Sequence, residues 1–366
     1  MEKSSNIAIV TSEFPPEPGG IGNHAFNLAN QLTKHNFTVS VVADQRLKSR
    51  DIELTFDNIQ PFKILRIKLK KVRLLMYINR IICVFKITCK NDVVIASGKF
   101  SLLVVALASL FYRKKMIAVI HGSEVNFKNR YLRKSIDISL TRFDKIIAVS
   151  KYTKSLVDYL DLKNIEVIPN GFNLSVGIPL KNSSLIGCPS LITVGSVTER
   201  KGQKNVILAL PEILKVFPET HYHIVGSPVE KEKLLELAKK NKVENNITFH
   251  GIVSDKEKNR LLSGSTIFVM LSENTKEGDV EGFGIALLEA NSLQIPVIGA
   301  TDCGIEDAVN NYKSGILVHN KNHKEFVQAM QYILNNYDSF KADSNKWSSN
   351  FTWDIVIKKY IKTIHF

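Results

Sequence analysis

Short apolar strands alternate with longer helical patterns along the whole chain. Residues 6–11 (Asn-Ile-Ala-Ile-Val-Thr) form the first predicted strand, which leads through a glycine-rich turn into a helical pattern containing His24, Leu28 and Leu32. A second strand is predicted at residues 37–43. This alternation is typical of parallel sheets covered by helices. The sequence therefore predicts an α/β fold.

The chain is long enough for two such domains. Its 366 residues exceed the usual size of one domain, and a hydrophobic content of 44% can fill two cores. The stretch 172–189 is rich in Gly, Pro, Ser and Asn and has no sustained periodicity, so the boundary is expected there. We predict a first domain over residues 1–172 and a second over residues 173–352.

Two carboxylates, Glu281 and Glu289, flank a predicted helix N-terminus at residues 282–284. The free backbone N–H groups of such a turn favour phosphate. If most of the interval is helical, the carboxylates lie about 10–12 Å apart, whereas a retaining hydrolase pair is about 5 Å apart. That spacing suits a nucleotide sugar, which has hydroxyls at both ends and a diphosphate between them. The alternative is an ordinary capped helix with two solvated glutamates.

Three further loops follow predicted strands. The first contains the glycines of residues 19–22, although its prolines separate them from the strand and exclude a dinucleotide fingerprint. The second carries His121 and Glu124, whose simpler interpretation is a loop histidine bonded to backbone. The third, after a strand at residues 191–194, carries Arg200 and Lys201, which would neutralise phosphate charge.

In chain order these segments resemble glycosyltransferase family 4. The segments that carry the resemblance are Gly19–Gly22, His121–Glu124, Ala148–Ser150, Val167–Gly171, Val194–Gly202, Ile224–Gly226, Phe249–Gly251 and Glu281–Glu289. The resemblance implies the GT-B architecture, in which two Rossmann-like parallel-sheet domains face each other across a cleft. It also implies that a final helix, residues 353–366, returns to the first domain.

The same resemblance implies a role for each matching residue of the second domain. Glu289 would bind the ribose hydroxyls, and Glu281 would bind the transferred sugar. The amides of Phe283, Gly284 and Ile285 would meet the sugar and the diphosphate.

Further roles follow for the other loops. Gly20 and Gly22 would approach the diphosphate from the first domain, and His121 would contact the transferred sugar near the reacting carbon. Lys201 would balance the charge of the leaving group. The chain departs from the family pattern at Ser196, where an arginine is common, and Arg200 is a candidate to replace it.

No metal or cofactor is expected, because the family binds its donor without a required divalent ion. Asp279 and Glu281 are interpreted as loop charge rather than as a metal-binding pair. The four cysteines, Cys83, Cys89, Cys188 and Cys303, show no C-x-x-C pairing, so neither zinc nor a disulfide framework is predicted. Together with the lack of an apolar secretory segment at the amino terminus, this favours a reducing cytoplasm.

The excess positive charge lies in the first half of the chain. Residues 1–180 contain 27 Lys and Arg against 14 Asp and Glu, while residues 181–366 contain 22 against 21. The densest part, residues 63–82, mixes cations with large apolar side chains, which favours an anionic membrane surface, with solvated lysines as the simpler alternative. The apolar run 102–111 is too short to span a bilayer and is predicted to be a core helix.

The leading interpretation is a retaining, metal-independent hexosyltransferase on the inner face of the cell membrane. It would move a sugar from a UDP- or GDP-sugar to a glycan, expected to be lipid-linked, in polysaccharide, lipopolysaccharide or glycolipid biosynthesis. A second possibility is a nucleotide-sugar epimerase or phosphorylase of the same plan. A nucleic-acid-binding protein is a third, but no recognition motif accompanies the positive charge.

Overall fold

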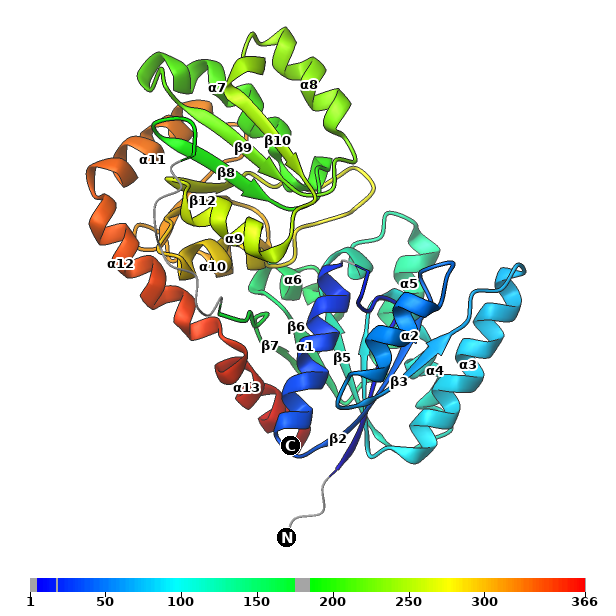
Figure 1. Ribbon diagram of the computed structural model, residues 1–366. Coiled ribbons are helices and arrows are strands. Elements are labelled where there is room, and N and C mark those ends of the chain that lie inside the picture. Colours follow the sequence, from blue (N-terminus) through cyan, green and yellow to red (C-terminus); the bar gives the residue numbers. More distant parts are fainter. Residues whose placement is uncertain (1–4, 18, 175–184, 366) are drawn as a thin grey trace. The chain divides into compact units, whose positions relative to one another are not determined.

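The chain folds into two compact units (Figure 1). The computed structural model describes residues 5–17, 19–174 and 185–365. One unit comprises Met1–Gly171 with Trp353–Phe366, and the other comprises Phe172–Thr352. The first unit thus ends at Gly171, one residue before the predicted boundary. Residues 175–184 of the predicted linker lie outside the described residues.

The first unit contains one sheet of seven parallel strands in the order β3-β2-β1-β4-β5-β6-β7. The strands are β1 (Asn6–Thr11), β2 (Thr38–Asp44), β3 (Lys63–Ile67), β4 (Val93–Ser97), β5 (Lys115–Ile120), β6 (Lys145–Ala148) and β7 (Ile165–Val167). The central strands β1, β4 and β5 are buried over nearly their whole length because helices cover both faces of a parallel sheet.

Seven α-helices belong to the described part of this unit. They are α1 (Gly20–Lys34), α2 (Asp51–Asn58), α3 (Arg73–Lys90), α4 (Lys99–Ala108), α5 (Arg130–Leu140), α6 (Lys151–Ser155) and α13 (Trp353–His365). Within α1, Leu28 and Leu32 are buried, which confirms the predicted amphipathic helix. Leu102 and Val105 of α4 are fully buried, as predicted for a core helix. The predicted apolar run continues past the end of α4, where Phe111 is 68% exposed.

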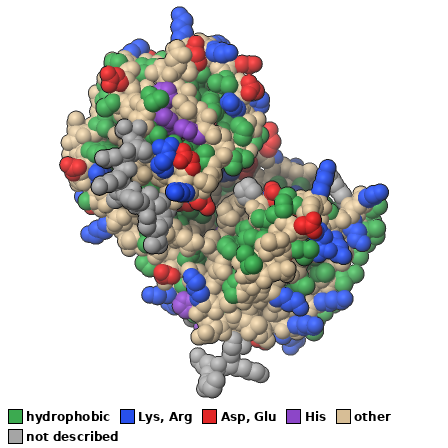
Figure 2. Space-filling model, viewed as in Figure 1, with side chains coloured by type: hydrophobic (Ala, Val, Ile, Leu, Met, Phe, Trp, Pro, Cys, Tyr) green, Lys and Arg blue, Asp and Glu red, His purple; other side chains and the backbone are tan. Residues whose placement is uncertain are grey.

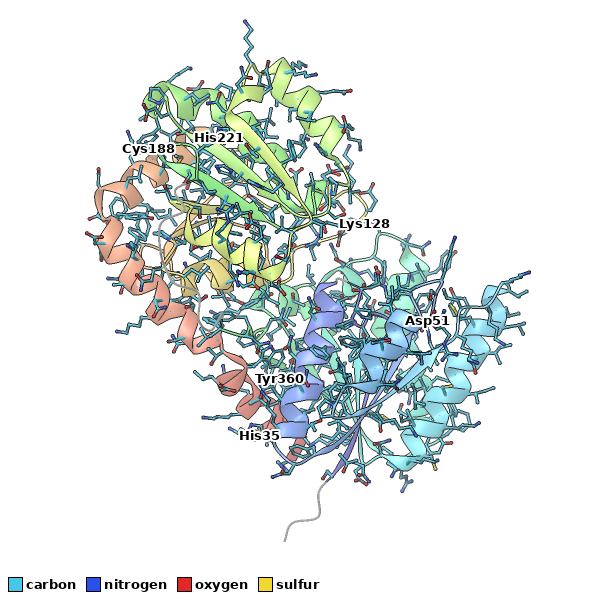
Figure 3. All side chains as sticks on the ribbon, viewed as in Figure 1. His35, Asp51, Lys128, Cys188, His221 and Tyr360 are labelled. Atoms are coloured by element: carbon cyan, nitrogen blue, oxygen red, sulfur yellow. The ribbon has the colours of Figure 1, made fainter. Side chains whose placement is uncertain are left out.

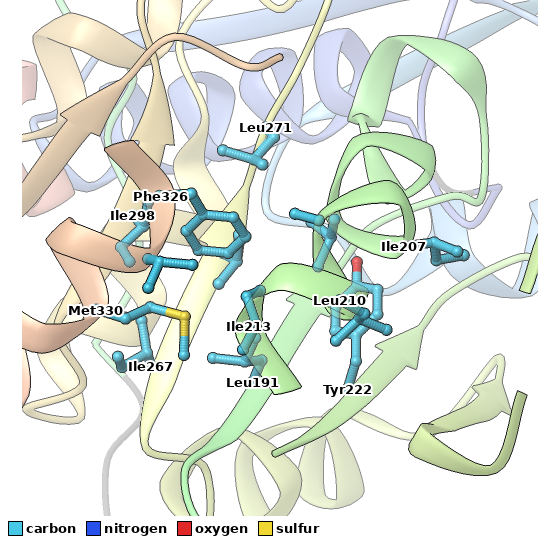
Figure 4. Packing of buried hydrophobic residues seen from close by; sticks show 14 of the residues in the cluster. Leu191, Ile207, Leu210, Ile213, Tyr222, Ile267, Leu271, Ile298, Phe326 and Met330 are labelled. Carbon is cyan, nitrogen blue, oxygen red and sulfur yellow. The ribbon is translucent and has the colours of Figure 1, made fainter. Parts of the chain in front are cut away.

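The second unit contains a six-stranded parallel sheet in the order β10-β9-β8-β11-β12-β13. The strands are β8 (Ser190–Val194), β9 (His221–Val225), β10 (Ile247–Gly251), β11 (Ile267–Met270), β12 (Val297–Ala300) and β13 (Gly315–Val318). The helices are α7 (Gln203–Val216), α8 (Lys231–Lys240), α9 (Asp255–Ser263), α10 (Ile285–Ser292), α11 (His323–Asn335) and α12 (Tyr337–Ser348). Figure 4 shows Phe326 and Met330 of α11 packed in the core with Leu191 of β8.

Both sheets reverse their strand order beside their first strand. In the first unit β2 and β4 lie on opposite sides of β1, and in the second unit β9 and β11 lie on opposite sides of β8. The loops that leave the carboxyl ends of such strands diverge and create the usual ligand site of doubly wound sheets. The glycine loop after β1 and the Arg200–Lys201 loop after β8 both start at these points.

The helix α13 packs against α1 within the first unit. Figure 3 labels Tyr360 on α13 beside α1, and its hydroxyl lies 2.9 Å from Nε2 of the buried His24. The ring centroid of Trp353 lies 5.5 Å from that of the same histidine, and the Thr363 hydroxyl donates to Glu166 of β7. The prediction that the final helix returns to the first domain is thus confirmed for α13.

Tyr360→Phe should therefore destabilise the protein. The substitution leaves His24 Nε2 buried without its partner, at a cost of about 1–3 kcal/mol of unfolding free energy. The matched control is Tyr332→Phe, because Tyr332 is 48% exposed. Urea unfolding would measure both variants, and equal midpoints for Tyr360→Phe and the control would contradict this account of the α1–α13 contact.

Candidate active site

Glycines allow the loop after β8 to fold tightly against its neighbours. Gly202 has a positive φ of 72°, and a Cβ atom there would lie 1.8 Å from the carbonyl oxygen of Leu271. A Cβ on Gly226, after β9, would lie 2.1 Å from the Gly195 carbonyl oxygen. The loop between Gly195 and Gly202 contains the 3₁₀ turn η3 (Glu199–Lys201), which carries the cations Arg200 and Lys201. Only glycine fits such approaches, so the loop's shape follows directly from its sequence.

Arg200, Lys201 and Glu281 form one ionic cluster in the second unit. Lys201 Nζ lies 2.8 Å from Glu281 Oε2, and an Arg200 guanidinium nitrogen contacts the same oxygen. The Nε–H of Arg200 also donates to Asp279 Oδ2 at 3.0 Å. The Glu281 side chain is 9% exposed, so it is the buried centre of the cluster. The loop after β8 and the segment before α10, far apart in sequence, are joined by these charges.

The cluster keeps its members charged. Burial by itself would raise the pKa of Glu281, but the charges of Lys201 and Arg200 outweigh it and the pKa is lowered. For Arg200, burial opposes the charge, and the carboxylates of Glu281 and Asp279 raise its pKa above the ordinary value. At neutral pH the site therefore holds two cations around one buried anion.

The segment before α10 leaves three consecutive backbone N–H groups available. Within the described residues, the amides of Phe283, Gly284 and Ile285 have no hydrogen-bond partner. The side chain of Phe283 is only 1% exposed and packs on Phe351 with ring centroids 5.8 Å apart, which anchors the turn. A Cβ on Gly304 would lie 2.0 Å from the Gly282 carbonyl oxygen, so the backbone at Gly304 packs directly against the turn.

The helix α10 begins at Ile285, as predicted, with Gly284 at its N-cap. Only the second half of the Glu281–Glu289 interval is therefore helical, whereas the predicted separation assumed helix over most of it. Glu289 forms its own ion pair, with Lys258 Nζ of α9 at 3.0 Å. Burial opposes the lysine's charge, but Glu289 raises the pKa of Lys258.

In the first unit, His121 follows β5 and is held from two sides. Its Nε2 lies 2.9 Å from the hydroxyl of Ser97 at the end of the adjacent strand β4. Its backbone N–H donates to the carboxylate of Glu124, which lies in the 3₁₀ turn η1 (Ser123–Val125). The histidine is thus bonded to a side chain and to a carboxylate rather than to a backbone carbonyl.

The surroundings keep the histidines neutral. Burial lowers the pKa of His121 to about 4. Burial, and then the neighbouring His121, lower the pKa of His24 well below its ordinary value, and the two rings lie 5.0 Å apart. Burial raises the pKa of Glu124 to about 7, and Glu13 adds to the effect.

The two glycines predicted to approach a diphosphate differ in their surroundings. A Cβ on Gly20 would meet nothing within 4 Å, so the space beside this exposed glycine is open. A Cβ on Gly22 would lie 3.0 Å from the backbone of Glu13 and Phe14. Gly22 therefore lets α1 pack against its own preceding loop.

The structure brings Lys201, Arg200 and Glu281 together beside the amides of residues 283–285, all within the second unit. Ser196 belongs to the same loop, has an exposed side chain, and accepts a hydrogen bond from Gln203 through its carbonyl. Sequence reasoning missed Lys258 and Ser97. A lysine in a polar helix such as α9 has no distinguishing signal in the sequence, although the serine that ends β4 could have been found from its place at the carboxyl edge.

Two family models match the chain. The model described as Glycosyltransferase Family 4 matches residues 18–176, and the one described as Glycosyl transferases group 1 matches residues 185–350. The chain is a GT4-type glycosyltransferase. The enzyme has the GT-B fold, with one parallel-sheet domain under each match.

Its similar proteins include enzymes of glycolipid and polysaccharide synthesis. The GDP-mannose-dependent alpha-(1-6)-phosphatidylinositol monomannoside mannosyltransferase of Mycobacterium tuberculosis is 24% identical over 97% of both chains. The putative colanic acid biosynthesis glycosyltransferase WcaL of Escherichia coli is 28% identical over 38% of this chain and 34% of its own. Anabaena HepE, solved with UDP and glucose, has a TM-score of 0.80 at 16% identity over 99% of both chains.

Glu281→Gln should destabilise the folded enzyme. Two cations then remain around an uncharged centre, which costs about 1–3 kcal/mol after allowance for their partial exposure. Because the folded pKa of Glu281 is lowered, its contribution is present above the ordinary value of 4.5 and is lost as pH falls through the folded pKa.

The wild type should therefore lose stability more steeply below pH 4.5 than Glu281→Gln does. Thermal melting between about pH 3 and 7 would measure this difference. Glu277→Gln is the control, because Glu277 is exposed and has no ion pair in the described chain. Parallel curves for the wild type and Glu281→Gln would show that the carboxylate makes no net contribution.

Proposed function

We propose that the enzyme is a retaining hexosyltransferase that takes its sugar from a nucleotide sugar and needs no metal ion. The observation that carries the proposal is the pairing of Lys201 and Arg200 with Glu281, close in sequence to the amides of residues 283–285, which have no hydrogen-bond partner in the described part of the chain. Cations and N–H groups at a helix N-terminus suit a diphosphate, and a carboxylate among them suits sugar hydroxyls. The nucleotide sugar is a substrate, and no cofactor is proposed.

The donor's nucleotide is proposed to extend toward Glu289. One oxygen of that carboxylate is paired with Lys258, which fixes its orientation and leaves the other oxygen for the ribose hydroxyls. UDP and GDP sugars both remain candidates, since the mycobacterial relative is named for GDP-mannose and HepE was solved with UDP. Gly20 and His121 keep their proposed roles toward the diphosphate and the sugar, whereas Gly22 is proposed to act by letting α1 pack against its preceding loop.

In the proposed reaction the bond between the anomeric carbon and the diphosphate breaks while the oxygen of an acceptor hydroxyl forms a bond on the same face of the sugar, and the hydroxyl proton passes to the departing diphosphate. Negative charge develops on the departing diphosphate, and Lys201 with Arg200 stabilises it. Before the donor binds, Glu281 pairs with both cations and holds them in position. Such preorganised cations reduce the reorganisation needed in the transition state.

Lys201→Ala should lower turnover by on the order of 100-fold or more, with the product still retained at the anomeric carbon. A mass-spectrometric screen of nucleotide sugars identifies the donor, and NMR of the product gives its configuration. Lys204→Ala is a control in the adjacent helix. An inverted product, or activity that EDTA abolishes and magnesium restores, would contradict the mechanism. Free sugar phosphate formed without acceptor would instead identify a phosphorylase.

We also propose that the acceptor is a lipid-linked glycan at the cytoplasmic face of the membrane, bound through the surface of residues 68–75. Lys68, Lys70 and Lys71 are exposed. Their apolar neighbours Leu69, Val72, Leu74 and Leu75 are 47–64% exposed. Figure 2 shows cationic and hydrophobic side chains sharing the visible face of the first unit. No helix of the described chain has the length and apolarity to cross a membrane.

The structure corrects the prediction for two cations of the basic stretch 63–82. Arg80 is 4% exposed, and its guanidinium pairs with Asp44. Arg66 has a side chain only 3% exposed, and it pairs with Asp57 at 2.7 Å and with Glu53 at 3.6 Å. The strand β3 directs it into the protein, where two carboxylates of α2 compensate its charge. The side chain of Arg73, also predicted to contribute, lies outside the described residues.

Replacing Lys68, Lys70 and Lys71 together by glutamine should weaken binding to anionic vesicles. Each lysine near such a surface contributes about 1 kcal/mol, so the affinity should fall by on the order of 100-fold at low salt. Co-sedimentation with anionic and neutral vesicles measures it. The matched control replaces Lys239, Lys240 and Lys256, which are exposed on the second unit. Equal sedimentation of the two triple variants on anionic vesicles would contradict the proposal that residues 68–75 bind the membrane.

A further inference from the structure

Glu124 is a buried carboxyl group directly beneath a site residue. Only 4% of the residue is exposed, and its Oε1 accepts the backbone N–H of His121. The N–H groups of Gly122 and of Glu124 itself also interact with this carboxyl. Its second oxygen, Oε2, is buried and has no hydrogen-bond partner in the described residues. A half-satisfied buried carboxyl is costly, so its presence at this position needs an explanation.

The backbone at this turn depends on that carboxyl. Gly122 has φ 121° and ψ −67°, a conformation that side-chain-bearing residues rarely adopt. The turn therefore has little intrinsic preference for its shape, and the N–H groups that it directs inward converge on Glu124. The imidazole of His121 is held separately, through Nε2 and the hydroxyl of Ser97. The ring and the backbone of this histidine thus have different supports.

We propose that Glu124 is a positioning residue for transfer: its ionised carboxylate fixes the turn that carries His121, and its protonated form lets that turn relax. The proposal rests on the proposed role of His121 beside the transferred sugar. A carboxylate binds N–H groups more strongly than a neutral carboxyl group does, so ionisation tightens the turn. Glu124 does not touch the substrate and acts only through His121.

The neighbouring groups place this change near neutral pH. Burial raises the pKa of Glu124 to about 7, and Glu13, in the loop after β1, adds to the effect. The pKa values of His121 and His24 are lowered, so these histidines stay uncharged in that range.

Other charges on the surrounding elements are engaged elsewhere or exposed. They are Lys99 of α4, whose Nζ lies 4.3 Å from the Phe127 ring centroid, the exposed Lys128, Arg130 and Lys134 before and on α5, and Arg133 and Asp137 of α5, which both bind the Tyr159 hydroxyl. No ion pair of Glu124 occurs among the described residues. A neutral-range inflection in turnover would therefore belong to a glutamate, although a histidine is the usual assignment.

The experiment measures turnover at saturating donor and acceptor between about pH 5.5 and 8.5. Wild-type turnover should rise through about pH 7 as Glu124 ionises. In Glu124→Gln the amide oxygen still accepts the N–H bonds but cannot ionise, so turnover should stay near the wild type's low-pH level, on the order of 10-fold below the wild type at pH 8. Glu124→Asp should restore an inflection.

A stability measurement tests the titration without activity. The folded pKa of Glu124 is raised, so its contribution is present below the ordinary value of 4.5 and is lost as pH rises through about 7. The melting temperature of Glu124→Gln should therefore gain on that of the wild type between pH 4.5 and 8. Melting curves also show whether each variant is folded.

The proposal is overturned if folded Glu124→Gln keeps the wild-type inflection, or if wild-type turnover is flat through neutral pH. It is also overturned if the difference in melting temperature between the wild type and Glu124→Gln does not change with pH. A wild type that transfers no sugar from any nucleotide donor would instead sink the proposed function. A wild type that transfers sugar while Glu124→Gln behaves identically would sink only the role of Glu124.

Discussion

Parallel pairing directs the carboxyl end of every strand in a sheet to the same edge, and the candidate site residues depend on that constraint. In the second unit, β8 delivers Lys201 and Arg200 to this edge, and the loop after β11 delivers Glu281. In the first unit, β4 ends at Ser97 and β5 leads to His121, whose side chains are therefore neighbours. The chemistry is assembled by strand order rather than by closeness in sequence.

The ionic cluster of the second unit is not explained by stability alone. Burying a carboxylate has a desolvation cost that its partners only partly offset, and an apolar trio would fill such a space as well. Lys201 and Arg200 remain partly exposed, at 16% and 25% of their side chains, while Glu281 is nearly covered. This asymmetry leaves the cations accessible to an anionic ligand while their orientation is already set.

The sequence predicted most of the fold because its signals are local. Apolar strands such as residues 6–11, and glycines such as Gly284 at the N-cap of a helix, can be located from the sequence itself. The ion pairs were not predictable in the same way. The burial of Arg66 by the carboxylates of α2, and the pairing of Glu289 with Lys258, depend on how helices pack on the sheet. A single sequence contains no periodic signal for such pairing.

Among the candidate site residues, the sequence could place Arg200 and Lys201 in the loop that follows β8, whereas their roles in binding and transfer stay predictions. The structure adds that the two cations share one carboxylate. The contact of Gly22 with the backbone of Glu13 and Phe14 could not be predicted from the motif. In a sequence, a glycine that leaves room for a ligand cannot be distinguished from one that leaves room for a neighbouring backbone segment.

The second unit is inserted between two parts of the first, and this has a consequence for biosynthesis. His24 and Tyr360 are 336 positions apart, yet they share a hydrogen bond. A ribosome releases Phe172–Thr352 before it releases α13, so the second unit can complete its core while the first still lacks one helix. Until then, the α1 surface that α13 covers stays open to other chains, and chaperones have a defined place to act on the nascent enzyme.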